Sequence, residues 1–260
     1  MAIELEGGCR VFRIQDGEPL RRGALGVWRQ VGRENGTKAI SLSALRLAGG
    51  SSAAWRNADC DEVLFVVEGE GNVVLGGRRL PIGPRAGVFV RPNETVAVED
   101  PGAAPLALLD SRCPDPGPQF HFAEPGPSLS ESARRDLSPV VRFEGQPTER
   151  AGDGRWFRVL VDAKAGCEQT TQFVGFIPPG RSPEHFHEYE EVVCILSGHG
   201  RFWSGAASHP ISAGTGLYLP RRQPHCLENT GSEPLQLYGL FHPSGSPAVR
   251  YHPGGSAPPS

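Results

Sequence analysis

The chain repeats one pattern of short apolar segments, and this repeat restricts its fold more than any other feature. Gly50 aligns with Gly180, and the segment DEVLFVVEGEG aligns with EEVVCILSGHG. Glu62 and Glu191 then occupy the same place, and each stands six spacers before a glycine. Self-similarity of this kind is the signature of one structural unit that occurs twice. The sequence therefore predicts two copies of one fold.

Each copy consists of short apolar runs that turn-forming residues separate. Runs such as EVVCIL and LQLYGLF lie between signals such as PPG, SG and NTG, and the chain holds 34 Gly and 25 Pro among 260 residues. Many short strands at regular spacing are typical of an all-β sandwich or barrel. The best helical candidate, residues 128–138, is short. We expect an all-β chain with these parts: an N-terminal barrel 1–112, a Pro/Gly/Ser-rich linker 113–140, a C-terminal barrel 141–252 and a disordered tail 253–260.

Charge and composition exclude several classes of function. The 26 Lys and Arg residues nearly balance the 29 Asp and Glu residues, whereas nucleic-acid binding would need a basic patch. No apolar run approaches the roughly 20 residues of a membrane span, and the N-terminus lacks the apolar region of a signal peptide. The six cysteines form no C-x-x-C pair, which favours small buried side chains. We expect a cytoplasmic protein that binds neither nucleic acid nor membrane.

The second copy contains a set of side chains that suits a metal ion. His185 and His187 are separated by one residue, Glu191 follows, and His225 comes from the later segment GTGLYLPRRQPHCLEN. Side chains alternate along a β-strand, so residues two apart project from the same face. His185 and His187 can therefore reach one ion together. Three imidazoles and a carboxylate suit a divalent transition metal.

The first copy lacks this set. Trp55 and Asn57 stand opposite the histidine pair, Val96 stands opposite His225, and only the carboxylate persists, as Glu62. A lone glutamate with these neighbours is no transition-metal site. The first copy is then a scaffold that packs against the second or mediates oligomerisation, or it retains a pocket for an organic ligand, since barrels of this kind enclose cavities.

The two segments of the second copy resemble the two cupin motifs. The first motif is Gly, five spacers, His-x-His, three or four spacers, Glu, six spacers and Gly, and the chain departs from it by one spacer fewer after Gly180. The second motif is Gly, five spacers, Pro-x-Gly, two spacers, His, three spacers and Asn, and Arg222 replaces its inner glycine. The positions that match this second motif are Gly214, Pro220, His225 and Asn229.

The resemblance implies a bicupin, that is, two small jelly-roll β-barrels in tandem. The metal would lie inside the C-terminal barrel and be held by His185, His187, Glu191 and His225. Four protein ligands on an octahedral ion leave two positions open, unlike a closed structural zinc site. Such a ligand set admits Fe, Mn, Ni, Cu or Zn.

Other side chains near the motifs carry alternative interpretations. Tyr189 lines the cavity and acts as an acid or base, or it only packs. One interpretation of Arg181 and Arg222 is that they bind a substrate carboxylate, and the alternative is that both are solvated surface residues. Trp203 and Tyr218 contact the substrate, or they pack in the core.

The cupin resemblance does not decide the reaction, because one fold hosts many functions. Our leading hypothesis is a metal-dependent dioxygenase or other oxygenase that acts on a small organic substrate together with O₂. A second hypothesis is a non-redox metalloenzyme: an isomerase, lyase, decarboxylase or hydrolase. A third is a binding or sensing protein. The oligomeric state is a monomer or a homodimer.

Overall fold

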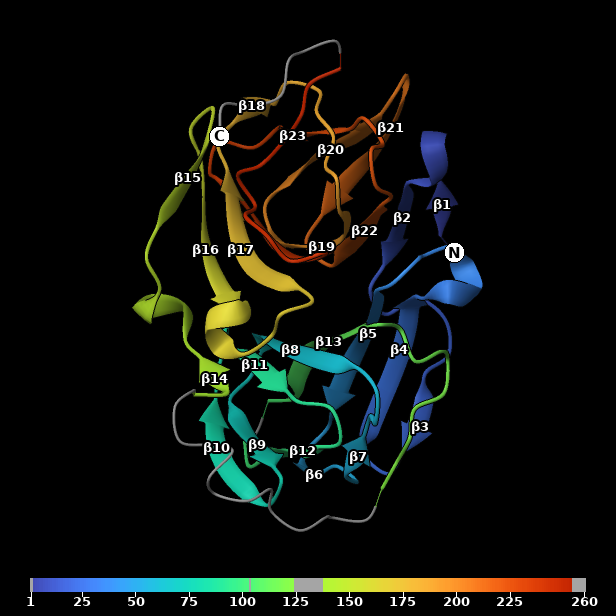
Figure 1. The fold of residues 1–260 in the computed structure, drawn as a ribbon, viewed down its shortest axis with the longest axis vertical. Helices are drawn as coiled ribbons and strands as arrows, with labels where there is room; N and C mark the ends of the chain where they lie inside the picture. The colour runs from blue at the N-terminus through green and yellow to red at the C-terminus, as the bar shows by residue number, and fades with distance from the viewer. Residues whose placement is uncertain (1, 103, 124–137, 254–260) are drawn as a thin grey trace.

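The computed structural model describes residues 2–102, 104–123 and 138–253. Within these ranges the regular structure is β-strand with short 3₁₀ turns and contains no α-helix, so the all-β prediction is confirmed. The helical candidate 128–138 lies outside the described residues except for Ser138. The same is true of the predicted tail, apart from Pro253. Figure 1 shows two barrels stacked along the long axis of the molecule.

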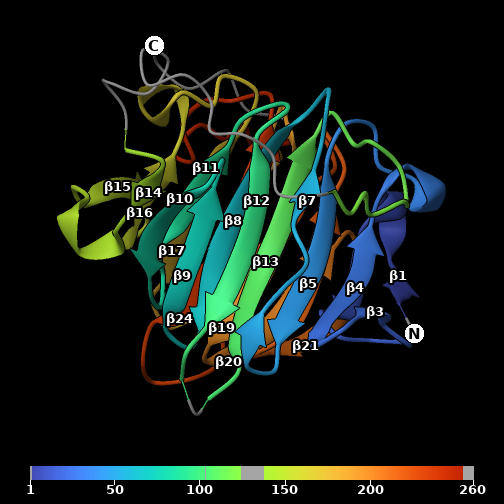
Figure 2. The ribbon, with the colours of Figure 1, turned by 90° about the horizontal axis from the view of Figure 1, so that it is seen from below.

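Two sheets form the N-terminal barrel, and Figure 2 shows their strands from below. The larger has the order β14 (Val140–Val141), β11 (Gly87–Val90), β8 (Asp61–Glu68), β13 (Leu106–Cys113), β5 (Ser41–Leu47), β4 (Leu25–Val31), β3 (Leu20–Arg22). The smaller has the order β10 (Arg78–Ile82), β9 (Gly71–Leu75), β12 (Thr95–Asp100), β6 (Gly50–Ser51), with β7 (Trp55–Arg56) also paired to β12.

The C-terminal barrel is built in the same way. Its larger sheet has the order β1 (Ile3–Glu4), β2 (Arg10–Arg13), β22 (Thr215–Leu219), β19 (Glu190–Ser197), β24 (Leu235–His242), β17 (Thr171–Ile177), β16 (Arg155–Val161), β15 (Glu149–Gly152). Its smaller sheet has the order β18 (Gly180–Arg181), β23 (Cys226–Asn229), β20 (His199–Ser204), β21 (Ala207–Ser212). The two large sheets share one strand order: β11, β8, β13, β5, β4 and β3 in the first correspond in turn to β22, β19, β24, β17, β16 and β15 in the second. This match confirms the two copies predicted from the repeat.

The barrels exchange their first strands, which the sequence did not reveal. β2 precedes the N-terminal barrel but pairs with β22 of the C-terminal barrel, with Val11 opposite Leu217. β14 precedes the C-terminal barrel but pairs with β11 of the N-terminal barrel, with Val140 opposite Val88. The predicted boundaries therefore do not separate the sheets, because each half supplies an edge strand to the other. Pairing also covers sheet edges that would otherwise expose unpaired backbone groups.

The two large sheets pack against each other through a shared apolar core. Strand β19 shows how alternation divides its side chains: Val192 and Cys194 lie in the core between the barrels, whereas Val193 and Ile195 lie inside the C-terminal barrel. Because successive side chains point to opposite faces, one strand serves both layers. Phe65 of β8 contacts Tyr238 of β24 across the interface, with ring centroids 4.9 Å apart.

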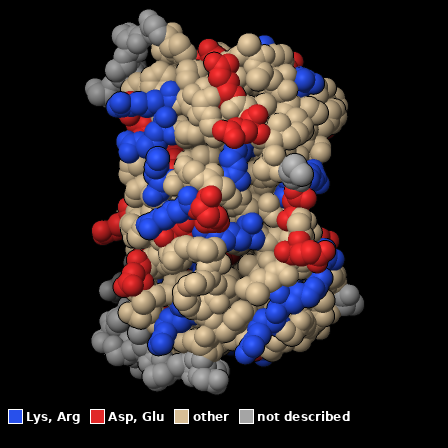
Figure 3. All heavy atoms as spheres, turned by 90° about the vertical axis from the view of Figure 1, so that its right-hand side faces the viewer, with Lys and Arg blue, Asp and Glu red and all other residues tan. Residues whose placement is uncertain are grey.

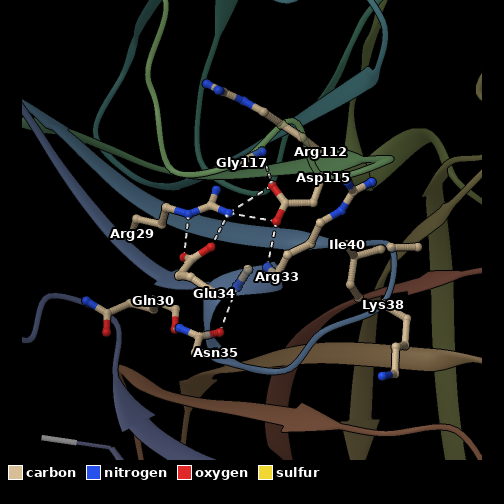
Figure 4. Close-up of polar contacts among 12 residues, drawn as sticks. Arg29, Gln30, Arg33, Glu34, Asn35, Lys38, Ile40, Arg112, Asp115 and Gly117 are labelled. Atoms are coloured by element: carbon tan, nitrogen blue, oxygen red, sulfur yellow. Dashed lines mark hydrogen bonds and ion pairs between the residues drawn. The ribbon is translucent and has the colours of Figure 1, made fainter.

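The chain that leaves the last strand of the N-terminal barrel is fixed by one carboxylate. Asp115 accepts hydrogen bonds from Arg29 at 2.7 Å and from the backbone N–H groups of Arg33 at 2.7 Å and Gly117 at 2.9 Å. Arg29 also donates to Glu34 at 2.7 Å. Figure 4 shows this network beside β4. The start of the predicted linker is therefore ordered against the first barrel.

Charges of both signs are interspersed on the face that Figure 3 displays, as expected from the near balance of acidic and basic residues. No helix in the described part of the chain is long and apolar enough to cross a membrane.

Candidate metal centre

Three histidines meet inside the C-terminal barrel. The ligand nitrogens that His185, His187 and His225 offer lie within 4.8 Å of one another, and all three residues are buried. A pair of backbone hydrogen bonds joins His185 to His225 at 3.0 and 2.8 Å, which places their side chains together. Alternation brings His187 to the same face as His185. The predicted histidine cluster is therefore present.

Each histidine is held by a backbone carbonyl. The Nδ1 atoms of His185, His187 and His225 lie 2.9 Å from the carbonyl oxygens of Pro183, Val249 and Gln223. A carbonyl oxygen only accepts, so each Nδ1 carries the proton and each Nε2 keeps its lone pair. Partners of this kind fix the tautomer and orientation of metal-binding imidazoles.

Burial also keeps these imidazoles neutral. It lowers the pKa of His185, and burial followed by the charge of His185 lowers the pKa of His187 to about 3. Burial and the neighbouring histidines hold the pKa of His225 well below its ordinary value. Neutral imidazole is the form that binds metals. The donor set therefore fits a divalent transition metal.

Glu191 lines the same cavity but stands outside the close histidine group. Its side chain comes from β19 and is buried, and burial raises its pKa to about 8. Among the described residues no hydrogen-bond donor reaches its carboxylate. Gly239 leaves room mainly for the Phe173 ring and also for this carboxylate, because a Cβ atom there would overlap Phe173 Cε1 and would lie 3.1 Å from Glu191 Oε1. A buried carboxylate without a donor is costly unless a cation or a proton satisfies it, so Glu191 is the natural candidate for a fourth ligand.

The cavity beside the cluster is mainly apolar. Its volume is about 90 Å³. A single water molecule needs roughly 10–15 Å³ on the same measure, so the cavity has room for more than one. Tyr189 is part of its wall and stacks between His187 and Phe241, at centroid distances of 4.5 and 3.9 Å. Burial, with the nearby Glu191 carboxylate, raises the pKa of Tyr189 well above its usual value. Tyr189 is thus a neutral phenol at the site. The apolar and aromatic part of the lining includes Trp156, Phe157, Phe173, Phe176, Ile177, Leu219 and Leu227.

The four residues predicted to contact substrate lie outside this cavity. Arg222 is an exposed partner of Glu188 at 2.8 Å. Arg181 lies over the ring of Trp203, 4.0 Å from its centroid, on the small sheet. Tyr218 packs between the barrels, because in β22 its neighbours Leu217 and Leu219 take the cavity face.

Two arginines that the sequence analysis did not select line the cavity instead. Arg155 begins β16, and Arg250 belongs to the segment that follows β24. This segment forms part of the cavity wall, where Tyr251 pairs with Phe186 and the carbonyl of Val249 holds His187. No cupin motif includes these positions, and no signal in the sequence placed them near the histidines.

The N-terminal barrel fills the equivalent place with its own side chains. Trp55 pairs with Val96 as His185 pairs with His225. The Trp55 indole donates to Glu62 at 2.7 Å, and Asn57 also donates to this carboxylate. Arg112 lies 3.5 Å from Glu62 and 2.8 Å from Asp110, and all of these side chains are buried. The Glu62 carboxylate is therefore satisfied by protein groups.

Asp110→Asn is expected to remove a pH dependence of folding stability. Burial, only partly offset by Arg112, raises the pKa of Asp110 to about 8. An aspartate ionises near pH 4 in the unfolded chain but only near pH 8 at this buried position. The free energy of unfolding therefore falls as the pH rises from about 4 to about 8, because the unfolded chain ionises first. Urea denaturation between pH 5 and 8 is expected to show a smaller decline in stability for Asp110→Asn than for wild type. An equal decline in both would contradict the assignment.

The chain is similar in sequence to known cupins. A family model described as a cupin domain matches residues 173–241. Protein SchB of Streptomyces halstedii is 31% identical over 105 residues, which cover 40% of this chain and 75% of SchB. Auxin-binding protein 1 of Arabidopsis thaliana is 34% identical over 71 residues, which cover 24% of this chain and 36% of that protein.

Solved structures show the same fold over nearly the whole chain. Bacillus subtilis oxalate decarboxylase, a protein with Mn(II) centres, superposes with a TM-score of 0.73 at 14% identity, covering 91% of this chain and 78% of its own. A Pseudomonas aeruginosa protein named for its induction by glyoxylate superposes with a TM-score of 0.71 at 17% identity, covering 92% and 90%. The chain therefore belongs to the cupin superfamily, with two barrels arranged as in a bicupin and a candidate metal centre in the second.

Proposed function

We propose that the protein is a metal-dependent enzyme that acts on a small organic substrate inside its C-terminal barrel, with oxygenase chemistry as the leading reaction class. The observation that carries the proposal is the cluster of His185, His187 and His225 at the wall of a cavity. Glu191 would complete the ligand set. A site made only to hold a structural ion would need no adjoining cavity.

The residues around the cluster define what the protein itself contributes. The three carbonyl partners hold the imidazoles in one orientation. The apolar walls exclude water and favour the apolar body of an organic substrate and uncharged O₂. A bound Fe, Mn, Ni or Cu ion would supply redox or Lewis-acid chemistry, and Zn would supply Lewis-acid chemistry alone.

Tyr189 favours a second candidate, a non-redox metalloenzyme such as a decarboxylase, isomerase or lyase. Its phenol stays protonated and faces the cavity beside His187. A neutral hydroxyl at this place can donate a hydrogen bond, or a proton at Oη, to an oxygen of the substrate. Such a donor is useful in reactions that pass through an enolate.

Oxygen uptake separates the two candidates. Protein loaded in turn with Fe(II), Mn(II) or Zn(II) is mixed with diketone and enediol substrates in an oxygen electrode. The oxygenase proposal expects uptake that matches substrate loss with Fe(II) or Mn(II) and none with Zn(II), and loss of uptake in Glu191→Ala. Substrate turnover by the zinc form under argon would overturn it in favour of the second candidate. For that candidate we expect Tyr189→Phe to slow turnover by about 10²-fold or more.

A further inference from the structure

Two mostly buried arginine side chains at the cavity share one exposed carboxylate. Arg155 and Arg250 both line the cavity that contains the histidine cluster. Arg250 lies 2.8 Å from Asp153 Oδ2, and Arg155 lies 3.5 Å from the same oxygen. The arginine side chains are only 13% and 16% exposed, whereas that of Asp153 is 48% exposed. The pair is therefore held at the cavity while its counter-ion faces solvent.

The arginines have more charge and more donors than their neighbours satisfy. Two guanidinium charges against one carboxylate leave a net charge of +1. Arg155 Nε and Arg250 Nη1 are buried and have no hydrogen-bond acceptor among the described residues. Arg155 Nη2 has only the 3.5 Å ion pair with Asp153, which is not a hydrogen bond. Buried polar groups are nearly always paired, and an unpaired guanidinium donor is costly. An anion from outside the chain would provide the hydrogen-bond acceptor that these nitrogens lack.

Arg155 also joins the cavity to a second hollow. This outer hollow has a volume of about 250 Å³. It is lined by Asp153, Arg155, Ile177 and residues 178–183, which include Arg181. Ile177 and Arg155 line both spaces. Arg155 thus lies where a ligand in the inner cavity would meet the outside.

The inner cavity suits the body of an aromatic or aliphatic molecule. Trp156 lies next to Arg155 on β16 and stacks on Phe176 with a centroid distance of 3.6 Å and an angle of 7° between the rings. Phe157 and Phe173 contact edge to face at 6.2 Å. Apolar walls with a few polar groups at one place are typical of sites that fix a ligand by its charged end.

From these observations, and resting on the proposed function, we infer that the substrate is an organic carboxylate. Arg155 and Arg250 bind its carboxylate group, and its apolar or aromatic body lies in the cavity with the histidine cluster. The planar guanidinium matches a carboxylate in geometry.

Calorimetric titration with 3-phenylpropionate tests this inference directly. We expect Arg155→Gln and Arg250→Gln each to weaken binding by about 10- to 100-fold, which corresponds to the loss of a charge-assisted hydrogen bond. Arg222→Gln, which removes the exposed arginine that the sequence suggested, serves as the matched control and is expected to bind like wild type. The neutral amide 3-phenylpropionamide is expected to bind wild type as weakly as the acid binds the cavity variants.

Three outcomes would overturn the inference: equal affinity for the acid and the amide, an Arg222→Gln loss as large as that of Arg155→Gln, or tighter binding of phenyl phosphate than of the carboxylate. The Arg155→Lys variant is expected to bind the acid with an affinity between those of wild type and Arg155→Gln. Such a partial rescue would show that the effect arises at the binding site and not from a change of fold. Thermal melting of each variant verifies folding.

Metal content separates this inference from the proposed function. Arg155→Gln and Arg250→Gln are expected to keep the wild-type metal content, whereas His187→Ala loses it. A protein that binds no metal but still distinguishes the acid from the amide through the two arginines would refute the proposed enzyme and support the carboxylate site. A metal-loaded protein that does not distinguish them would refute only the carboxylate site.

Discussion

Glu190→Ala is expected to lower the free energy of unfolding by about 3–5 kcal/mol, because several hydrogen-bond donors lose the acceptor that they share. The Glu190 side chain leaves the C-terminal barrel on the face opposite to Glu191. It accepts hydrogen bonds from the backbone N–H groups of Lys38, Ala39 and Ile40 at 3.0, 2.6 and 2.8 Å, and from Tyr218 at 2.9 Å. Alanine would leave the Ile40 N–H and the Tyr218 hydroxyl buried without an acceptor, and each costs about 1–3 kcal/mol. The hydrogen bonds of Lys38 and Ala39, which are partly buried, would also be lost.

Glu188→Ala is the matched control for this prediction. Glu188 lies two residues away, its side chain is 40% exposed, and it forms an ion pair with the exposed Arg222. Its loss is expected to cost less than about 1 kcal/mol. Urea denaturation of both variants measures the difference. Because Glu190 faces away from the histidines, folded Glu190→Ala protein is expected to keep its metal content. A loss in Glu190→Ala no larger than that in Glu188→Ala would show that the hydrogen bonds from residues 38–40 to Glu190 do not stabilise the fold.

His225→Ala is expected to weaken binding of a divalent metal by at least about 100-fold. Removing a group that only hydrogen-bonds to a metal ligand already weakens binding by about 10- to 100-fold, and this change removes a ligand itself. His225 is 4% exposed, and its ring centroid lies 4.8 Å from that of His185 and 5.3 Å from that of His187. Alanine removes one of the three clustered donors and leaves the fold of β23 in place. Competition with a fluorescent chelator measures the affinity.

His199→Ala provides the control for a general effect of losing a histidine. His199 is exposed at the start of β20, and Thr230 donates hydrogen bonds to its backbone carbonyl rather than to its ring. We expect its metal affinity to equal that of wild type. Equal loss of affinity in His199→Ala and His225→Ala would place the metal elsewhere on the chain.

The sequence predicts those features that depend on local spacing. Alternation along a strand is enough to place His185 and His187 on one face, and the repeat is enough to find Trp55 and Asn57 where the first barrel has no imidazole. The structure adds the reason that this barrel is closed to a metal: its Glu62 already accepts from Trp55 and Asn57.

Features that depend on contacts between distant segments could not be predicted in this way. Arg155 and Arg250 are separated by a whole barrel in sequence and meet only because the segment after β24 forms part of the cavity wall. The sequence left Tyr218 either at the substrate or in the core, and strand register decides between them: Leu217 and Leu219 face the cavity, whereas Tyr218 faces the other barrel. A shift of one residue reverses the face of every side chain. The exchange of β2 and β14 is likewise a non-local pairing.

Elemental mass spectrometry of protein purified without a tag and without chelators tests the central claim most directly. We predict about one Fe, Mn, Ni, Cu or Zn ion per chain in the wild type, and loss of that ion in His187→Ala and in Glu191→Ala. Retention of the ion in both variants would contradict a metal centre at the histidine cluster. A wild-type protein that contains no metal and takes up none on dialysis against each ion would contradict a metal-dependent function altogether.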